Sequence, residues 1–188
     1  CGYTKSSDLI GSVLGTVLGG EDAFLMKHDG AGNAAWNFTP SGTGKSRAKG
    51  VAVDAAGNIY VCGWFEDIID LHGNSLLGTG LVTSAGNTDW YVASYTAAGI
   101  LRWSVRLGGS GNDEPVGLAI SGSQVMVFGK VNGVISTSFG SMAAVLPNKQ
   151  NLVVATYNLN GVGQWLASAG SGDNERPLAI AADDQRVY

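Results

Sequence analysis

The chain has 188 residues, 45% of them hydrophobic, which is enough to bury a sizeable core. With 29 glycines and only 14% charged residues, the composition predicts many turns and few long helices. The net charge of −4 and the scattered lysines and arginines argue against nucleic acid as a partner. The absence of a long apolar run argues against membrane insertion. The presence of only two cysteines argues against a disulfide framework and against a four-ligand zinc site.

Two kinds of strand recur in a fixed order along the chain. The first is an apolar run that starts with an acidic or amide residue, and the second follows a glycine turn and carries a tryptophan. The first kind reads DAFLMKHD from Asp22, DWYVASYT from Asp89 and NLVVATYN from Asn151. The second kind contains Trp36, Trp103 and Trp165. Both kinds recur at the same two spacings, so the chain repeats itself.

A glycine-rich loop and two more strands complete each repeat. The loops read GTGKSRAKG, GGSGNDEPVG and AGSGDNERP, and they lead into VAVD from Val51, LAIS from Leu118 and LAIA from Leu178. The last strand reads NIYVCGW from Asn58, QVMVFGK from Gln124 and QRVY ending at Tyr188. The turn DAAGN, residues 54–58, joins two of these strands through a glycine that is free to adopt a positive φ.

Four short strands per repeat predict an all-β fold of three tandem four-stranded antiparallel sheets. One such sheet cannot bury both of its faces, so neighbouring sheets must stack face to face, as the blades of a β-propeller do. We expect a single array with repeats at about 1–61, 62–127 and 128–188, and tryptophans that fill the space between blades. Three blades are too few for a closed ring, so the chain is expected to be a fragment of a larger propeller or to assemble from several copies.

The repeats resemble the SBBP-type β-propeller repeat family of secreted and surface proteins, which has NHL-like blades. The resemblance rests on LVTSAGNTDWYVASY, LRWSVRLGGSGNDEPVGLAI and VAVDAAGNIYVCGWF. It departs from the family in the first copy, where GTGKSRAKG replaces the acidic loop, and in the third, which lacks the LTSAG-like stretch. The resemblance implies that VAVD, LAIS and LAIA are the innermost strands, followed outward by the NIYVCGW, DWYVASY and tryptophan strands. It also implies an extracellular or cell-surface location.

Several motifs that suggest other chemistry have simpler interpretations. The stretch TPSGTGKS, residues 39–46, is similar to a phosphate-binding loop but lacks its first glycine and aligns with a loop between strands, so we expect no nucleotide. Cys1 and Cys62 align within one strand type, and we expect both to be buried free thiols. His28 and His72 are expected to be solvated loop histidines, with no catalytic partner.

The loops between blades and between the second and third strands of a blade are expected on one face. Because binding residues concentrate on loops held by a rigid scaffold, this face is the predicted contact surface. Its candidate residues are Asp70, His72, Asp113, Glu114, Asp173, Glu175 and Arg176. No cofactor is predicted. These carboxylates could hold Ca²⁺, but no calcium-loop motif supports it, and turn-forming or capping roles are the simpler interpretation.

Three functions stay open at this point. The first is a non-enzymatic extracellular module with a structural, adhesive or protein-interaction role, whose partners are other repeats of the parent protein or other proteins. The second is a lectin-like propeller that binds glycans, favoured if Trp64, Trp90 or Tyr3 is exposed on the loop face and disfavoured if they are buried. The third is a polysaccharide-acting enzyme, which needs two acidic side chains about 5 to 10 Å apart in a cleft.

Overall fold

The computed structural model of the chain describes residues 1–5, 8–9, 12–13, 20–72, 81–133, 150–170 and 176–183. All regular secondary structure in these ranges is β-strand, so the prediction of an all-β fold is confirmed. Within the same ranges no helix has the length and apolar character needed to cross a membrane.

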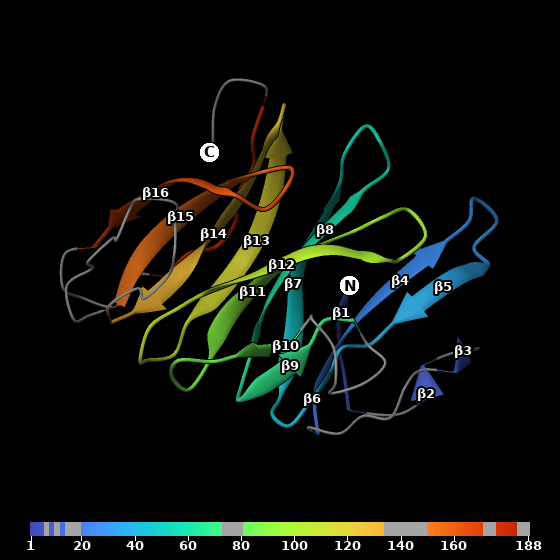
Figure 1. Cartoon of the computed structure of the whole chain (residues 1–188), viewed down its shortest axis with the longest axis horizontal. Coiled ribbons are helices and arrows are strands. Elements are labelled where there is room, and N and C mark those ends of the chain that lie inside the picture. Colours follow the sequence, from blue (N-terminus) through green and yellow to red (C-terminus); the bar gives the residue numbers. More distant parts are fainter. Residues whose placement is uncertain are drawn as a thin grey trace.

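Two four-stranded antiparallel sheets form the centre of the molecule (Figure 1). The first contains β7 (Ser46–Val53), β8 (Ile59–Phe65), β11 (Asp89–Tyr95) and β12 (Leu101–Leu107). The second contains β13 (Glu114–Ser121), β14 (Gln124–Asn132), β15 (Gln150–Asn158) and β16 (Gly163–Ala169). Strands lie side by side in chain order in both sheets, which is the order expected for propeller blades.

A third sheet holds part of another blade, made of β1 (Gly2–Thr4), β4 (Asp22–His28) and β5 (Ala34–Phe38). Gly2 pairs with Phe24 as Gly63 pairs with Tyr91 one repeat later. The segment CGY therefore takes the place that CGW takes in β8, as the repeat alignment predicted. The predicted repeat boundaries at residues 62 and 128 fall inside β8 and β14, so each four-stranded sheet contains residues of two sequence repeats. The exact limits of the repeats stay a prediction.

Five shorter strands lie outside the blades. β6 (Ser41–Gly42), β9 (Ile68–Asp70) and β10 (Leu81–Thr83) form a small sheet in the order β10–β9–β6, and β2 (Asp8–Leu9) pairs with β3 (Ser12–Val13). The sequence predicts no strand between NIYVCGW, which starts at Asn58, and DWYVASYT, which starts at Asp89. β9 and β10 are too short to show an alternating pattern, and β9 forms by pairing with β6 from the preceding loop.

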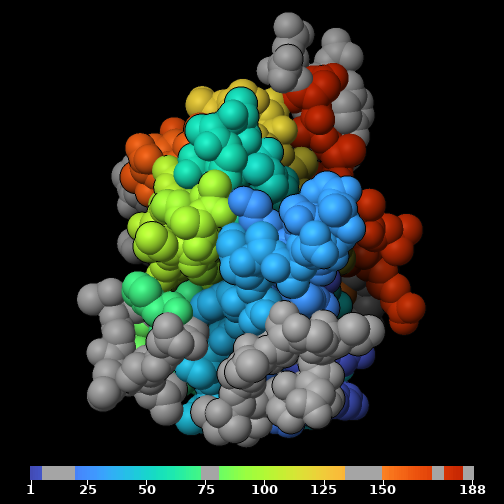
Figure 2. All heavy atoms as spheres, turned by 90° about the vertical axis from the view of Figure 1, so that its right-hand side faces the viewer, coloured from blue at the N-terminus to red at the C-terminus, as the bar shows by residue number. Residues whose placement is uncertain are grey.

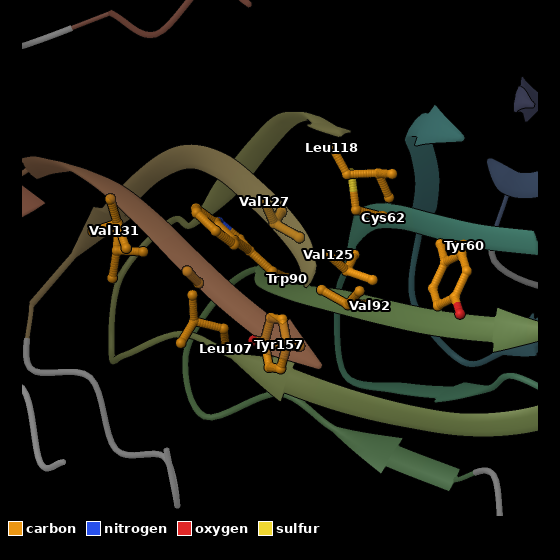
Figure 3. Packing of buried hydrophobic residues seen from close by; sticks show 12 residues of the cluster. Tyr60, Cys62, Trp90, Val92, Leu107, Leu118, Val125, Val127, Val131 and Tyr157 are labelled. Atoms are coloured by element: carbon orange, nitrogen blue, oxygen red, sulfur yellow. The ribbon is translucent and has the colours of Figure 1, made fainter. Parts of the chain in front are cut away.

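The hydrophobic core lies between neighbouring sheets. Trp90 and Val92 of β11 pack towards Val125 and Val127 of β14, with Tyr157 of β15 beside them (Figure 3). Burial of each large apolar side chain contributes roughly 1.5–3 kcal/mol. The indole Nε1–H of Trp90 also donates to the carbonyl of Lys130, 3.0 Å away in the next sheet. The sheets are therefore held together by the face-to-face packing that the repeats predicted.

Innermost strands of adjacent sheets touch through glycine. A Cβ at Gly50 of β7 would lie 2.9 Å from Cα of Gly117 in β13, closer than side chains normally approach. Glycine at this position lets the two strands meet at the inner edge, as the implied blade order requires.

The structure also locates three further features of the sequence: the turn 54–58, the two cysteines and the stretch 39–46. The turn 54–58 has Gly57 at φ 81°, and Asp54 Oδ1 accepts hydrogen bonds from the backbone N–H groups of Ala56 and Asn58. Both cysteines are free, and Cys62 is buried as expected, but the same expectation for Cys1 is wrong because Cys1 is exposed. Residues 39–46 contribute β6 and the first residue of β7, and no helix follows them as a phosphate-binding loop requires.

Candidate functional site

One edge of the blades gathers the candidate residues. At this edge β13 begins and β14 ends, and Glu114 pairs with Lys130 in the ladder. The corresponding pair in the preceding blade is Arg47 and Trp64, at the start of β7 and the end of β8. We call this the loop edge, because the loops between blades and between the second and third strands both leave the sheets here. The strand register therefore places both kinds of loop on one side of the sheets, as the sequence predicted.

A pocket of about 490 Å³ opens at the loop edge of the second blade. Charged and polar side chains of the blade and of the following segment meet in it over a small apolar surface. Its lining residues are Glu114, Val116, Lys130, Gln150, Arg176, Pro177 and Leu178. The pocket thus combines charged recognition groups with exposed apolar area, since Leu178 is 89% exposed.

Glu114 is the centre of the charges around this pocket. Its Oε1 lies 2.5 Å from Lys49 Nζ of the neighbouring blade, and its Oε2 lies 3.4 Å from Lys130 Nζ. Burial alone would raise the pKa of Glu114, but the hydrogen bond and charge of Lys49 and the charge of Lys130 outweigh it and lower the pKa. Glu114 is therefore ionised at neutral pH.

Among the residues that the structure describes, positive charge is in excess around the pocket. Lys49, Lys130 and Arg176 surround a single described carboxylate, Glu114, and Arg176 has no ion pair with any residue that the structure describes. A guanidinium carries five donors arranged to fit a carboxylate. The site is chemically suited to a ligand that carries one or more negative charges.

A second cluster occupies the loop edge of the preceding blade. The guanidinium of Arg47 lies 4.0 Å from the ring centre of Tyr3 and 5.3 Å from that of Trp64. Glu21 accepts a hydrogen bond from Arg47 Nε at 2.8 Å and pairs with Lys5 at 2.9 Å. The hydrogen bonds from Lys5 and Arg47 lower the pKa of Glu21. Tyr3 is 44% exposed, so an aromatic face is accessible beside fixed charges.

Two carboxylates are buried beneath the loop edge. A Cβ at Gly108 would lie 2.6 Å from both Asp113 Oδ2 and Asp89 Cγ, so the two carboxyl groups approach each other across this glycine. Arg106 pairs with Asp89. Asp113 accepts hydrogen bonds from the backbone N–H groups of Gly109 and Asn132, both at 2.6 Å.

The electrostatic consequence is a perturbed carboxyl group. Burial raises the pKa of Asp113 to about 6, against the lowering effect of its backbone hydrogen bonds, and the nearby charge of Asp89 adds to the rise. Because both side chains are fully buried, they do not face a cleft as the catalytic pair of a polysaccharide-acting enzyme must. Asp113 ties the loop before β13 to the end of β14.

The structure places the sequence-predicted site residues in different environments. Glu114 and Arg176 line the pocket, whereas Asp113 is buried below the same edge. Asp70 is also buried, and its Oδ1 accepts a hydrogen bond from the backbone N–H of His72, whose imidazole is 40% exposed. Asp70 and Asp113 therefore do not present carboxylates on the surface, which corrects their proposed place on a contact surface and agrees with the capping interpretation. Asp173 and Glu175 lie outside the described residues.

Sequence reasoning missed Lys49 and Lys130, which complete the charges of the pocket. Lys130 occupies the same position in its repeat as Trp64 and Tyr3 do in theirs, at the loop edge of the strand. The repeat alignment alone could therefore have placed Lys130 at this edge. Lys49 was harder to find because it reaches Glu114 from another blade. In the described part of the chain no three His, Cys, Asp or Glu side chains come together as a metal site would need.

Comparisons with known proteins find two relatives at low identity, one of them a repeat protein. The chain is 26% identical over 177 residues to an uncharacterized WD repeat-containing protein of Acanthamoeba polyphaga mimivirus, an alignment that covers 85% of this chain. It is 28% identical over 164 residues to the regulatory protein FlaEY of Caulobacter vibrioides, covering 87% of this chain. The chain spans only 12% and 16% of the lengths of these relatives. No family model matches it.

Proposed function

We propose that this chain is a non-catalytic protein-interaction module that binds an acidic segment of a partner protein at the loop edge. The observation that carries the proposal is the excess of positive charge among the described residues around the pocket, with Arg176 free of any described ion pair. The likeness to a WD repeat-containing protein supports a repeat module of this kind. The mixed lining gives an extended acidic peptide both ionic and apolar contacts.

The test uses a fluorescein-labelled hexaglutamate peptide as the probe and fluorescence anisotropy at low ionic strength as the readout. Arg176→Gln and Lys130→Gln are each expected to weaken binding about twofold to fivefold, because partly exposed ion pairs contribute about 0.4–1 kcal/mol. Glu114→Gln is expected to strengthen binding, because it removes the pocket's own carboxylate.

Lys45→Gln is the matched control, since it removes the same charge from an exposed residue that does not line the pocket. It is expected to leave the affinity unchanged. An equal loss with Lys45→Gln would mean that the peptide senses net charge alone. Tighter binding of a hexalysine peptide than of hexaglutamate would contradict the proposal.

For the location we propose the extracellular space or the cell surface, with an adhesive or structural role. Its support is the resemblance of the repeats to those of secreted and surface proteins. Protease treatment of intact cells that produce the parent protein tests it: the repeats should be cleaved without cell lysis. Protection of the repeats until lysis would contradict it.

A second candidate function is glycan binding by the cluster of Tyr3, Arg47 and Trp64. The 44% exposure of Tyr3 favours it, because an accessible ring next to hydrogen-bonding groups is what sugar recognition needs. The complete burial of Trp90 removes one of the three aromatic residues considered for this role. Retention on a glycan array that Tyr3→Ala abolishes, and that Arg176→Gln leaves intact, would favour this function over the first.

A further inference from the structure

The two buried carboxyl groups beneath the loop edge approach each other across a glycine. Asp89 of β11 and Asp113, which directly precedes β13, are both fully buried. Asp89 Oδ1 and Asp113 Oδ2 lie 2.7 and 2.6 Å from where a Cβ would stand on Gly108. Asp89 Oδ1 has no hydrogen-bond partner among the described residues. This oxygen therefore points into a buried space that it shares with the second carboxyl group.

The other three oxygens of the pair already accept hydrogen bonds. Asp89 Oδ2 accepts from a backbone N–H group at 2.9 Å and from the guanidinium of Arg106. Asp113 Oδ1 and Oδ2 accept from the backbone N–H groups of Asn132 and Gly109, at 2.6 Å each. Arg106 pairs with Asp89, but Asp113 forms no ion pair with any described residue. Ionisation of both carboxyl groups therefore leaves a buried negative charge without a described counterion.

A proton fits this space better than a metal ion does. Ca²⁺ takes about six to eight oxygen ligands, whereas three of the four carboxylate oxygens here are turned towards N–H donors. A proton on Asp113 Oδ2 instead donates to Asp89 Oδ1 and removes the uncompensated charge. Burial raises the pKa of both carboxyl groups, and the charge of Asp89 adds to the rise at Asp113.

The pair also holds the strands that line the pocket. Asp113 directly precedes Glu114, a lining residue, and its hydrogen bond fixes Asn132 at the end of β14. Asn132 pairs in the ladder with Gln150, which lines the pocket as well. A change in the charge of the pair therefore acts on the geometry of the loop edge.

The charged groups on the strands around Asp113 divide into two sets. Beyond the effect of burial, Asp89 raises and Arg106 lowers the pKa of Asp113. Glu114 of β13 instead pairs with Lys130 of β14 and Lys49 of β7 in the pocket. The charge within the buried space thus depends on Asp89, Arg106 and the proton.

We propose that Asp89 and Asp113 form a single proton-binding site that locks the loop edge closed, and that release of this proton to solvent lets the edge open. The midpoint of release is near pH 6, where Asp113 titrates, against about 4 for an ordinary aspartate. Because the closed edge binds the proton more tightly, the lock is complete below about pH 4 and is lost as the pH rises through 6. Full release makes opening easier by up to about a hundredfold.

The test follows the backbone amide signals of Gly109 and Asn132 by ¹⁵N NMR of the full chain between pH 4 and pH 7.5. Because both N–H groups donate to Asp113, both signals should shift with one midpoint near pH 6. In Asp89→Asn the midpoint should fall by about one pH unit or more, because an amide donor replaces the neighbouring charge. An unchanged midpoint in this variant would overturn the proposal, since burial of Asp113 alone would then account for it.

The neighbouring repeats supply a precedent and a control. Asn151 stands in the place of Asp89 one repeat later, and its Oδ1 likewise lies 2.7 Å from a Cβ on the glycine that follows β16, so the fold accommodates Asn here. Asp22 holds the same place one repeat earlier, where Ser46 replaces Asp113. Asp22→Asn is therefore the matched control and should leave the midpoint unchanged. An equal fall in Asp22→Asn and Asp89→Asn would overturn the proposal.

Amide hydrogen exchange measures the lock itself. After correction for the intrinsic pH dependence of exchange, protection of Gly109 and Asn132 should fall about tenfold between pH 5 and pH 7.5, and at most about twofold in Asp89→Asn. Level protection in the unmodified chain would overturn the proposal. Addition of CaCl₂ at pH 7.5 should leave both amide signals in place. Their return to the acid positions would also overturn it, because the site would then hold a metal ion.

The effect on the pocket rests on the proposed function and has a separate readout. Release of the proton places a negative charge beneath the pocket, so hexaglutamate should bind more weakly at pH 7.5 than at pH 5.5, with a smaller difference in Asp89→Asn. Equal differences in the two chains would overturn the link between the lock and the pocket. Absence of hexaglutamate binding at both pH values would contradict the proposed function alone, because the NMR midpoints decide the lock without any ligand.

Discussion

The two thiols of this chain differ in the environment of a single atom. Burial raises the pKa of the Cys62 thiol to about 12, whereas Cys1 is exposed. Since the thiolate is the reactive form, Cys62 should resist thiol reagents in the folded protein. With Ellman's reagent at pH 8 we expect one thiol to react in the native chain and a second only in guanidinium chloride. Cys1→Ser should abolish the fast reaction, and rapid reaction of two thiols in the native chain would contradict this burial.

Asp113 is the second residue whose environment predicts a measurable effect. Its pKa is raised to about 6, so the folded state holds its proton more tightly than the unfolded chain does. The free energy of unfolding that Asp113 supplies is therefore present below about pH 4 and is lost as the pH rises to about 6, by on the order of 2–3 kcal/mol.

Urea unfolding between pH 4 and pH 7 measures this effect by comparison with Asp113→Asn. The variant should be less stable at every pH, because Asn cannot accept both backbone hydrogen bonds, but the decline between pH 4 and pH 6 should disappear. Asp29→Asn is the control of opposite sign, since hydrogen bonds from Asn33 lower the pKa of Asp29. An unchanged pH dependence in Asp113→Asn would show that Asp113 titrates normally.

At the scale of the element, the turn 54–58 shows how one carboxylate shapes a hairpin. Asp54 accepts two backbone hydrogen bonds through Oδ1, while its Oδ2 accepts from the Asn58 side chain and from the hydroxyl of Tyr60 at 2.9 Å each. Asp29 makes the first three contacts in its own turn. We expect Asp54→Ala to lower the free energy of unfolding by about 2 kcal/mol and Asp29→Ala by less, because a net hydrogen bond contributes about 1 kcal/mol. Thermal unfolding compares them, and an equal loss would exclude a contribution of Tyr60.

Elements with strong local signals were the ones that the sequence predicted well. The turn 54–58 carries the turn-forming residues Asp54, Gly57 and Asn58, and each tryptophan strand carries its tryptophan at the same place in the repeat, because each repeat must pack against its neighbours in the same way. β9 and β10 were missed, since their pairing with each other and with β6 depends on contacts between separate loops. The pocket was found only in part for the same reason: Lys49 and Glu114 belong to different blades, and no local pattern brings them together.

For the whole molecule, stability should depend on the joints between blades. Repeats that contact only their neighbours fold as coupled units, and their cooperativity depends on the interfaces between them. At each joint a tryptophan donates from Nε1–H to a carbonyl in the outer turn of the next blade, Trp36 at 3.1 Å and Trp103 at 3.0 Å. At the joint of Trp36, the light-blue β4–β5 hairpin lies beside the yellow-green turn between β11 and β12 (Figure 2). The ring of Trp103 also packs 5.9 Å from Tyr60 and 6.3 Å from Tyr157, measured between ring centres. Removing this side chain should therefore weaken the coupling of the two complete blades.

The corresponding prediction compares Trp103→Ala with Trp165→Ala. Trp103→Ala is expected to lower the free energy of unfolding by about 3–5 kcal/mol, the usual cost of a large aromatic truncation, and to broaden the urea transition as the blades unfold separately. Trp165→Ala should cost much less, because its indole N–H has no described partner within the chain. Equal losses in the two variants would mean that each tryptophan stabilises mainly its own sheet, and the blades would then be coupled chiefly through the core around Trp90.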